Sequence, residues 1–146
     1  KDKMVQTVGR IKFECTSGML FITLPSERKL AYVKPRIEIN KFGREGITFE
    51  GIGESKRWCR VDTYGPKLVE NIVQATARDL LAEAMLAVDA AGYPIVMHVH
   101  DEIVIEAPVG QGSVTEVCGL MGQTPAWATG LPLRADGYEC DYYRKD

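Results

Sequence analysis

Two adjacent carboxylates, Asp101 and Glu102, follow His100 between two β-branched apolar runs. The apolar runs predict two strands, so the three polar residues mark the tip of a tight β-hairpin. A hairpin tip holds carboxylates at a fixed position and leaves them open to solvent. Hard cations such as Mg²⁺ take oxygen ligands and bind through one or two carboxylates together with substrate phosphates. The pair could supply half of such a site, although a solvated turn explains the same two residues.

His98 and His100 are two residues apart, a spacing that places both side chains on one face of a continuous strand. Such a pair could chelate zinc, but no third ligand lies within reach, and the four cysteines include no Cys-x-x-Cys pair. We therefore predict that His98 is packed or hydrogen-bonded within the sheet. His100 is predicted to donate a hydrogen bond to a phosphate or a terminal hydroxyl.

Four long polar side chains lie on one side of the helix predicted over residues 67–91. At 100° per residue, Lys67, Asn71, Gln74 and Arg78 fall within an arc of about 60°. Lys and Arg neutralise phosphates, and Asn and Gln donate to minor-groove acceptors that every base pair presents. The stripe could therefore read duplex shape, although an ordinary solvated helix face looks the same. The predicted core face of the helix carries Val69, Ile72, Val73, Thr76 and Leu80, and its second half is predicted to be buried nearly all round.

The elements that would position these residues belong to the α+β class. Residues 10–60 predict a basic antiparallel meander with strands at 10–15, 19–24, 29–33, 47–50 and 57–61. The long helix follows Pro66 and ends before Gly92 and Pro94. An antiparallel hairpin at 94–106 is expected to pack on this helix. Further expected elements are a helix at 111–122, a helical turn at 125–128 and a strand at 131–138, whereas residues 35–46 are left without a firm assignment.

The composition is that of one globular domain of 146 residues, and its charge is divided unevenly along the chain. Residues 1–60 hold 13 Lys/Arg and 7 Asp/Glu, whereas residues 61–146 hold 5 and 13. This division suits a part that meets phosphate and a part that holds cations, although chance also explains it. No apolar run approaches the roughly 18 residues of a membrane span. Scattered cysteines and the absence of a signal peptide favour a cytoplasmic location, and a start at Lys1 suggests a piece of a longer protein.

Residues 74–79 read QATARD, and residues 99–104 read VHDEIV. Together they resemble the C-terminal palm of family A DNA polymerases, in which a Q-x-T-A-x-D helix precedes a V-H-D-E hairpin called motif C. Residues 24–32, 63–75 and 130–138 are similar to the bacteriophage and prophage branch of that family. The resemblance covers nearly the whole chain. It implies a palm fragment, residues 1–62 being a strand-rich basic part and residues 63–146 a palm-like part.

The resemblance implies roles for four residues. Asp101 would ligate catalytic Mg²⁺, and Glu102 would help to shape the site as a less certain ligand. His100 would lie near the primer terminus, and Gln74 would contact the minor groove of the new duplex. The implied reaction is nucleotidyl transfer in which two Mg²⁺ ions, roughly 3.5–4 Å apart, act on primer–template DNA and a deoxynucleoside triphosphate.

Other residues of the stripe match the family less closely. The family often has an asparagine four residues before the glutamine, whereas Asn71 stands three before Gln74 and Glu70 fills that place. Lys67 and Arg78 are assigned to DNA from the helical stripe, and the resemblance adds nothing to them.

The family also needs a second metal-binding aspartate, in motif A, and a nucleotide-binding fingers helix, motif B. Neither occurs in this sequence, and the order of motifs in the family places both before Lys1. We therefore expect a missing N-terminal part and no activity from the isolated chain. Two alternatives stay open: a non-catalytic domain that binds duplex nucleic acid, and another Mg²⁺-dependent phosphoryl-transfer enzyme such as a nuclease. The nuclease would need further carboxylates, for which Asp79, Glu106 and Asp136 are the nominees.

Overall fold

The structure is a computed structural model that describes residues 4–39 and 43–143. It divides into two compact units, residues 1–76 and 77–146. Strands and helix occur in both, which confirms the predicted α+β class. The division falls within one long helix, so each unit contains part of that helix. None of the described helices combines the length and apolar character needed to cross a membrane.

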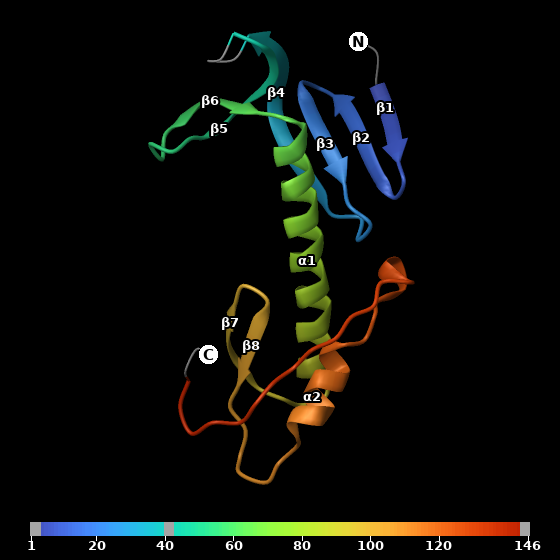
Figure 1. The fold of residues 1–146 in the computed structure, drawn as a ribbon, viewed down its shortest axis with the longest axis vertical. Coiled ribbons are helices and arrows are strands. Elements are labelled where there is room, and N and C mark those ends of the chain that lie inside the picture. The colour runs from blue at the N-terminus through green and yellow to red at the C-terminus, as the bar shows by residue number, and fades with distance from the viewer. Residues whose placement is uncertain (1–3, 40–42, 144–146) are drawn as a thin grey trace. The chain divides into compact units, whose positions relative to one another are not determined.

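The first unit contains a six-stranded antiparallel meander whose strand order follows the sequence (Figure 1). Its strands are β1 (Met4–Val8), β2 (Ile11–Thr16), β3 (Met19–Thr23), β4 (Lys29–Ile39), β5 (Glu45–Ile52) and β6 (Trp58–Thr63). Five of them correspond to the predicted strands. β1 was not predicted, and it joins β2 through a turn at Gly9, where a φ of 59° suits glycine. β4 extends into the unassigned tract 35–46, of which residues 40–42 lie outside the described part.

The core of the first unit lies between the sheet and the start of α1 (Gly65–Ala90). Ile22, Tyr32 and Leu68 are its buried residues. The rings of Tyr32 and Phe49 meet edge to face with centroids 5.0 Å apart. Partly buried apolar residues around them are Ile11, Phe13, Leu20, Leu30, Ile47, Phe49 and Ile72. This packing fixes the first half of α1 against the sheet.

Both ends of α1 follow from local sequence and lie within two residues of the prediction. Pro66 stands in the first turn, where its missing N–H costs nothing. At the other end Gly92 has a φ of 87°, and its N–H donates to the Asp89 carbonyl at 2.9 Å. The Tyr93 N–H donates to the Val88 carbonyl at 3.3 Å, and both of these residues are buried. Together these bonds form a Schellman motif, which ends the helix.

The apolar face predicted for α1 is partly wrong. Val69 and Val73 are each 59% exposed, whereas Leu68 is buried and Ile72 packs in the core. The second half is not buried all round either, because Leu86 is 67% exposed. A helical wheel averages over the whole helix, whereas each unit buries a stripe of its own. The stripe of the second unit consists of Leu81, Ala84 and Val88.

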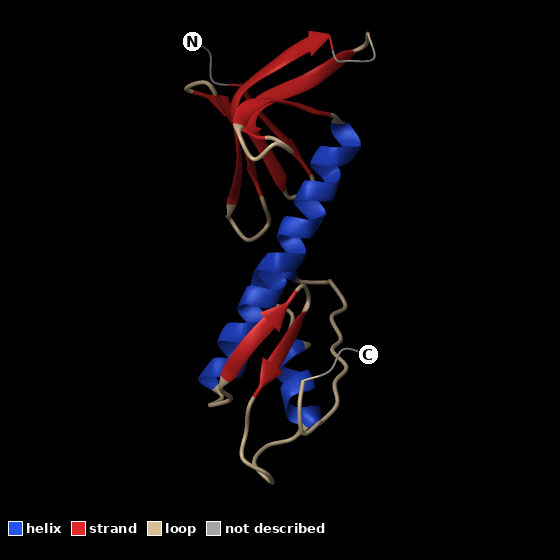
Figure 2. Ribbon diagram, turned by 90° about the vertical axis from the view of Figure 1, so that its left-hand side faces the viewer, coloured by secondary structure: helices blue, strands red, loops and turns tan. Residues whose placement is uncertain are grey.

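The second unit contains residues 77–90 of α1, a two-stranded sheet and two short helical segments (Figure 2). β7 (Ile95–Val99) and β8 (Glu102–Ile105) pair antiparallel, which confirms the predicted hairpin. α2 (Val114–Met121) is shorter than the predicted helix at 111–122. It starts late because Ser113 caps it, its hydroxyl accepting the Glu116 N–H at 3.1 Å. The 3₁₀ turn η1 (Ala126–Ala128) confirms the predicted helical turn.

The strand predicted over residues 131–138 is wrong, because this segment forms no strand in the structure. Pro132 has no N–H to donate to a ladder. The Leu131 N–H donates to the Ala128 carbonyl at 3.0 Å, and the Leu131 carbonyl accepts from the Thr124 hydroxyl at 3.1 Å. An alternating sequence becomes a strand only where a second strand pairs with it, which depends on tertiary structure.

Candidate functional site

The predicted acidic pair lies where β7 turns into β8. Val99 pairs with Glu102, so His100 and Asp101 form a two-residue loop. His100 has a φ of 51°, and tight two-residue hairpin loops require a positive φ in at least one central residue. Asp101 is exposed and makes no hydrogen bond or ion pair with any described residue. Its carboxylate is therefore open to solvent and to an external ligand.

Glu102 is the first residue of β8 and is partly buried. The Tyr143 hydroxyl donates a hydrogen bond to Glu102 Oε1 at 2.8 Å. The hydrogen bond to the carboxylate raises the pKa of Tyr143, because ionisation of the phenol would remove the donor and place two negative charges together. Tyr143 thus holds the Glu102 carboxylate in place. Asp101 and Glu102 are neighbours in sequence but have different surroundings.

His98 lies in β7 and meets Arg78 of α1. Each ring nitrogen of His98 is 3.4 Å from a guanidinium nitrogen of Arg78. A neutral imidazole has one acceptor nitrogen, so Arg78 donates to one of the two. His98 is exposed and contacts the helix, so the prediction that it packs or bonds within the sheet is wrong. The strand ends before His100, so the two histidines do not share one continuous strand.

The other three stripe residues lie on the part of α1 that belongs to the first unit. Lys67 Nζ is 2.9 Å from both Glu70 oxygens, and this hydrogen bonding raises the pKa of Lys67. Asn71 Nδ2 donates to the Tyr32 hydroxyl at 3.0 Å and so ties α1 to the sheet. Gln74 is exposed, and no described residue bonds its side chain. Its amide is therefore available to an external ligand.

The predicted site residues thus form two groups. His100, Asp101 and Glu102 lie at the hairpin of the second unit, where Arg78 of α1 contacts His98 of β7. Lys67, Asn71 and Gln74 lie on α1 in the first unit.

The donor set at the hairpin fits a hard divalent cation. Asp101 and Glu102 offer carboxylate oxygens, and Mg²⁺ binds through one or two such groups while keeping waters or substrate phosphates. No group of three or more His, Cys, Asp or Glu side chains suited to a metal occurs among residues 4–39 and 43–143. Asp101 and Glu102 thus match part of the ligand set that a magnesium site needs. The remaining ligands would come from water, substrate or other protein segments.

Sequence reasoning missed Tyr143. It stands 41 residues from Glu102 and belongs to no regular element, so neither spacing nor periodicity relates the two. The only local hint is a tyrosine pair, Tyr142 and Tyr143, in a charged C-terminal segment.

The chain is similar to a DNA polymerase of Bacillus phage SP02, with 52% identity over 145 residues. The matched region is 99% of this chain and 22% of the phage protein, so the chain spans about a fifth of that relative. No protein-family model matches the sequence. No solved structure matches it either.

Proposed function

We propose that this chain is the C-terminal palm portion of a bacteriophage-type family A DNA polymerase. The observation that carries the proposal is the 52% identity, over 99% of this chain, to a phage protein named DNA polymerase. The Q-x-T-A-x-D helix and the V-H-D-E hairpin lie within the matched length. Primer–template DNA and deoxynucleoside triphosphates are the proposed partners. Motifs A and B would come from the N-terminal part of the polymerase.

The hairpin residues take the chemical roles in this proposal. When bound, two Mg²⁺ ions supply activation of the primer 3′-hydroxyl and stabilisation of the departing pyrophosphate. Asp101 is the proposed direct ligand, because its carboxylate is exposed and has no partner among the described residues. Glu102 shapes the site from a position held by Tyr143. His100 donates a hydrogen bond near the primer terminus.

The stripe on α1 holds the duplex in this proposal. Gln74 donates to minor-groove acceptors with its free amide. Lys67 and Arg78 contact phosphates, which requires them to exchange Glu70 and His98 for the nucleic acid. One side-chain N–H of Asn71 already donates to the Tyr32 hydroxyl. Only its second side-chain N–H can therefore donate to DNA.

The nuclease alternative gains no support from the described residues. It needs further carboxylates of this chain at the hairpin, and no metal-binding group of three occurs in residues 4–39 and 43–143. Asp136, one of its nominees, forms an ion pair with Arg134 at 2.9 Å. The polymerase needs only part of the site from this chain, so the same observation does not count against it.

Replacement of Asp101 in the intact polymerase tests the proposal. We expect Asp101→Asn to lower the rate of primer extension by about a thousandfold or more, since a metal ligand is lost. Affinity for primer–template DNA should stay within about twofold, because the proposed role of Asp101 is to bind metal and not DNA, and asparagine has the same size.

The matched control is Asp89→Asn, which makes the same charge change at an exposed aspartate at the end of α1. It should leave both extension and affinity unchanged. Full extension by the Asp101→Asn polymerase would refute the proposed role and, with it, the assignment of motif C.

A further inference from the structure

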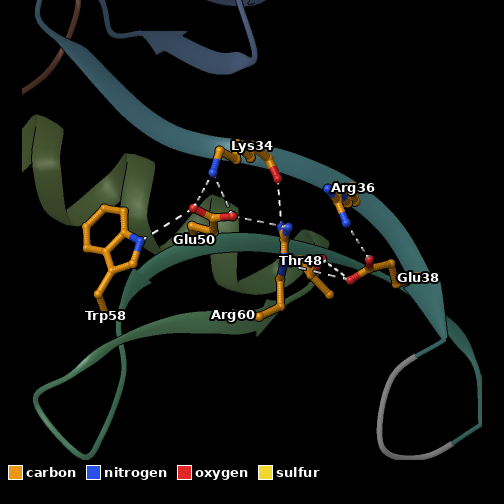
Figure 3. Close-up of polar contacts among 7 residues, drawn as sticks. All are labelled: Lys34, Arg36, Glu38, Thr48, Glu50, Trp58 and Arg60. Carbon is orange, nitrogen blue, oxygen red and sulfur yellow. Dashed lines mark hydrogen bonds and ion pairs between the residues drawn. The ribbon is translucent and has the colours of Figure 1, made fainter.

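A network of polar side chains crosses β4, β5 and β6 of the first unit (Figure 3). Lys34 Nζ donates to both Glu50 oxygens, at 3.1 and 3.0 Å. The Arg60 guanidinium donates to the Lys34 carbonyl at 2.7 Å and lies 3.7 Å from Glu50. Thr48 donates to Glu38 at 2.7 Å, and Arg36 lies 3.5 Å from the same carboxylate. None of these contacts belongs to the core of the unit.

Lys34 and Arg36 are the most exposed charged members of this network, whereas the third cation, Arg60, is 28% exposed. The side chains of Lys34 and Arg36 are each 60% exposed, whereas those of Glu50 and Glu38 are 24% and 37% exposed. Hydrogen bonds from Lys34 and from Thr48, respectively, lower the pKa of Glu50 and of Glu38, so both carboxylates stay ionised beneath their partners. A ligand that approaches from solvent therefore meets ammonium and guanidinium groups first.

Trp58 stands at the edge of this network. Its indole N–H donates to Glu50 Oε2 at 3.4 Å, yet the residue is 60% exposed. Ile52 pairs directly with Trp58 across the two strands and is 71% exposed. A tethered but exposed indole next to an apolar side chain offers a flat surface to a ligand. The β5–β6 loop next to Trp58 carries two exposed cations, Lys56 and Arg57, and one exposed acid, Glu54. On β6, the exposed acid Asp62 lies four residues from Trp58.

Lys34, which donates to Glu50 in this network, lies in a strained bulge of β4. The register of β4 and β5 shifts between Val33 and Arg36, and Lys34 takes a φ of 45° in this bulge. A positive φ in a residue other than glycine is uncommon. The strained peptide is held by a hydrogen bond from the Lys34 N–H to the Gly18 carbonyl at 2.7 Å. Bulges redirect side chains and occur often near functional sites, so the strain points to a use for this face.

One surface of the sheet, which we call the Trp58 face, consists of Lys34, Arg36, Ile52, Trp58 and Arg60. We propose that the Trp58 face binds single-stranded nucleic acid, with Trp58 stacking on a base and with Lys34 and Arg36 contacting phosphates. Single-strand sites in proteins combine cations that follow the backbone with aromatic rings that stack on bases, and this face has both. The inference rests on the proposed function in one respect: the strand would be the template of the polymerase.

The test measures binding of a fluorescently labelled oligo(dT) to the 146-residue chain by anisotropy. We expect Trp58→Ala to weaken binding by about tenfold, and Trp58→Phe to restore most of it, because a phenyl ring still stacks. The matched control is Trp127→Phe, at the second tryptophan, whose indole N–H donates to Glu83 in the other unit. This control should bind normally, and in its background oligo(dT) should quench the remaining Trp58 fluorescence.

Salt dependence tests the cations separately. The slope of log K against log salt concentration should become shallower by about 1.4 in a Lys34→Gln, Arg36→Gln double variant, since each single-strand phosphate contact contributes about 0.7. Lys29→Gln is the control, because Lys29 lies over the Phe21 ring on another part of the sheet. It should leave the slope unchanged. Circular dichroism of every variant establishes that the sheet is folded.

Normal oligo(dT) affinity in folded Trp58→Ala would overturn the inference, as would an unchanged slope in the double variant. Either result would favour a protein segment as the occupant of the Trp58 face. These outcomes are distinct from failure of the proposed function, which is read from primer extension with Asp101→Asn. If Trp58→Ala loses oligo(dT) binding but the intact protein has no polymerase activity, the Trp58 face is still a single-strand site. Only its identification with the template strand is then removed.

Discussion

At the residue scale, Asp101 and Glu102 differ in what surrounds them. Asp101 stands in the loop with an open carboxylate, whereas Glu102 accepts a hydrogen bond from Tyr143. A carboxylate whose rotamer is already fixed by a hydrogen bond from a neutral donor loses less conformational entropy when it binds a cation. We therefore treat Tyr143 as a positioning residue for Glu102.

Tyr143→Phe in the intact form of the proposed polymerase should lower kcat by about threefold to tenfold and leave KM for DNA within twofold, because one hydrogen bond to a charged group is lost. The Mg²⁺ concentration for half-maximal activity should also rise, which a merely structural role of Tyr143 would not cause. Tyr142→Phe is the control, since Tyr142 is 72% exposed and makes no hydrogen bond to a described residue. Equal effects of the two variants would contradict the positioning role.

The proposed contact of Gln74 with the minor groove also belongs to the residue scale, because it depends on one free side-chain amide. Gln74→Ala should weaken affinity for primer–template DNA by about fivefold while kcat at saturating DNA stays near normal, since it removes the proposed groove contact and no group that takes part in the chemistry. Gln111→Ala, at an exposed glutamine of a loop, serves as the control in the same binding titration. A loss of kcat with unchanged DNA affinity would show that Gln74 does not act by holding the duplex.

At the scale of elements, α1 depends on its C-terminal motif because it leads directly into the hairpin. Gly92 has a φ of 87°, and an added Cβ would meet no atom within 4 Å. Any cost of a side chain there would therefore come from backbone strain and not from a clash.

Gly92→Ala should lower the free energy of unfolding by about 1 kcal/mol, measured by urea denaturation. Gly119→Ala is a matched change inside α2, where a Cβ also meets nothing within 4 Å and the backbone is helical. It should raise the same free energy by about 0.5–1 kcal/mol, because alanine favours helix. Equal signs for the two substitutions would contradict the role of the left-handed backbone at Gly92.

At the scale of the whole molecule, each unit carries one part of the proposed machinery. The hairpin carboxylates lie in the second unit, and the Trp58 face and the free amide of Gln74 lie in the first. Among the described residues, no third metal-binding side chain joins Asp101 and Glu102. Catalysis in the proposed polymerase therefore requires acids beyond those that the described residues bring together.

The purified 146-residue chain should not extend a primer, even with Mg²⁺ and all four deoxynucleoside triphosphates present. It should still bind primer–template DNA weakly, with affinity that falls as salt rises, because the proposed contacts of Lys67 and Arg78 with phosphates are electrostatic. A gel-based extension assay together with a binding titration checks both statements. Measurable extension by this chain alone would contradict the proposed division of the metal site.

The sequence alone determined the elements whose signals are local. The two ends of α1 were predicted to within two residues from Pro66, Gly92 and Pro94. Two β-branched runs around three polar residues identified the β7–β8 hairpin. Such signals act through neighbouring backbone dihedrals and hydrogen bonds, so a few residues suffice to read them. The class of fold followed from the order of these elements.

Only the tertiary structure decided what depends on distant partners. It exposed Val69 and Val73 while burying Leu68, and it left residues 131–138 without a strand to pair with. It also joined Tyr143 to Glu102 and Asn71 to Tyr32. Burial and side-chain hydrogen bonding are set by contacts between segments far apart in the chain, and a periodic pattern does not specify which segments meet.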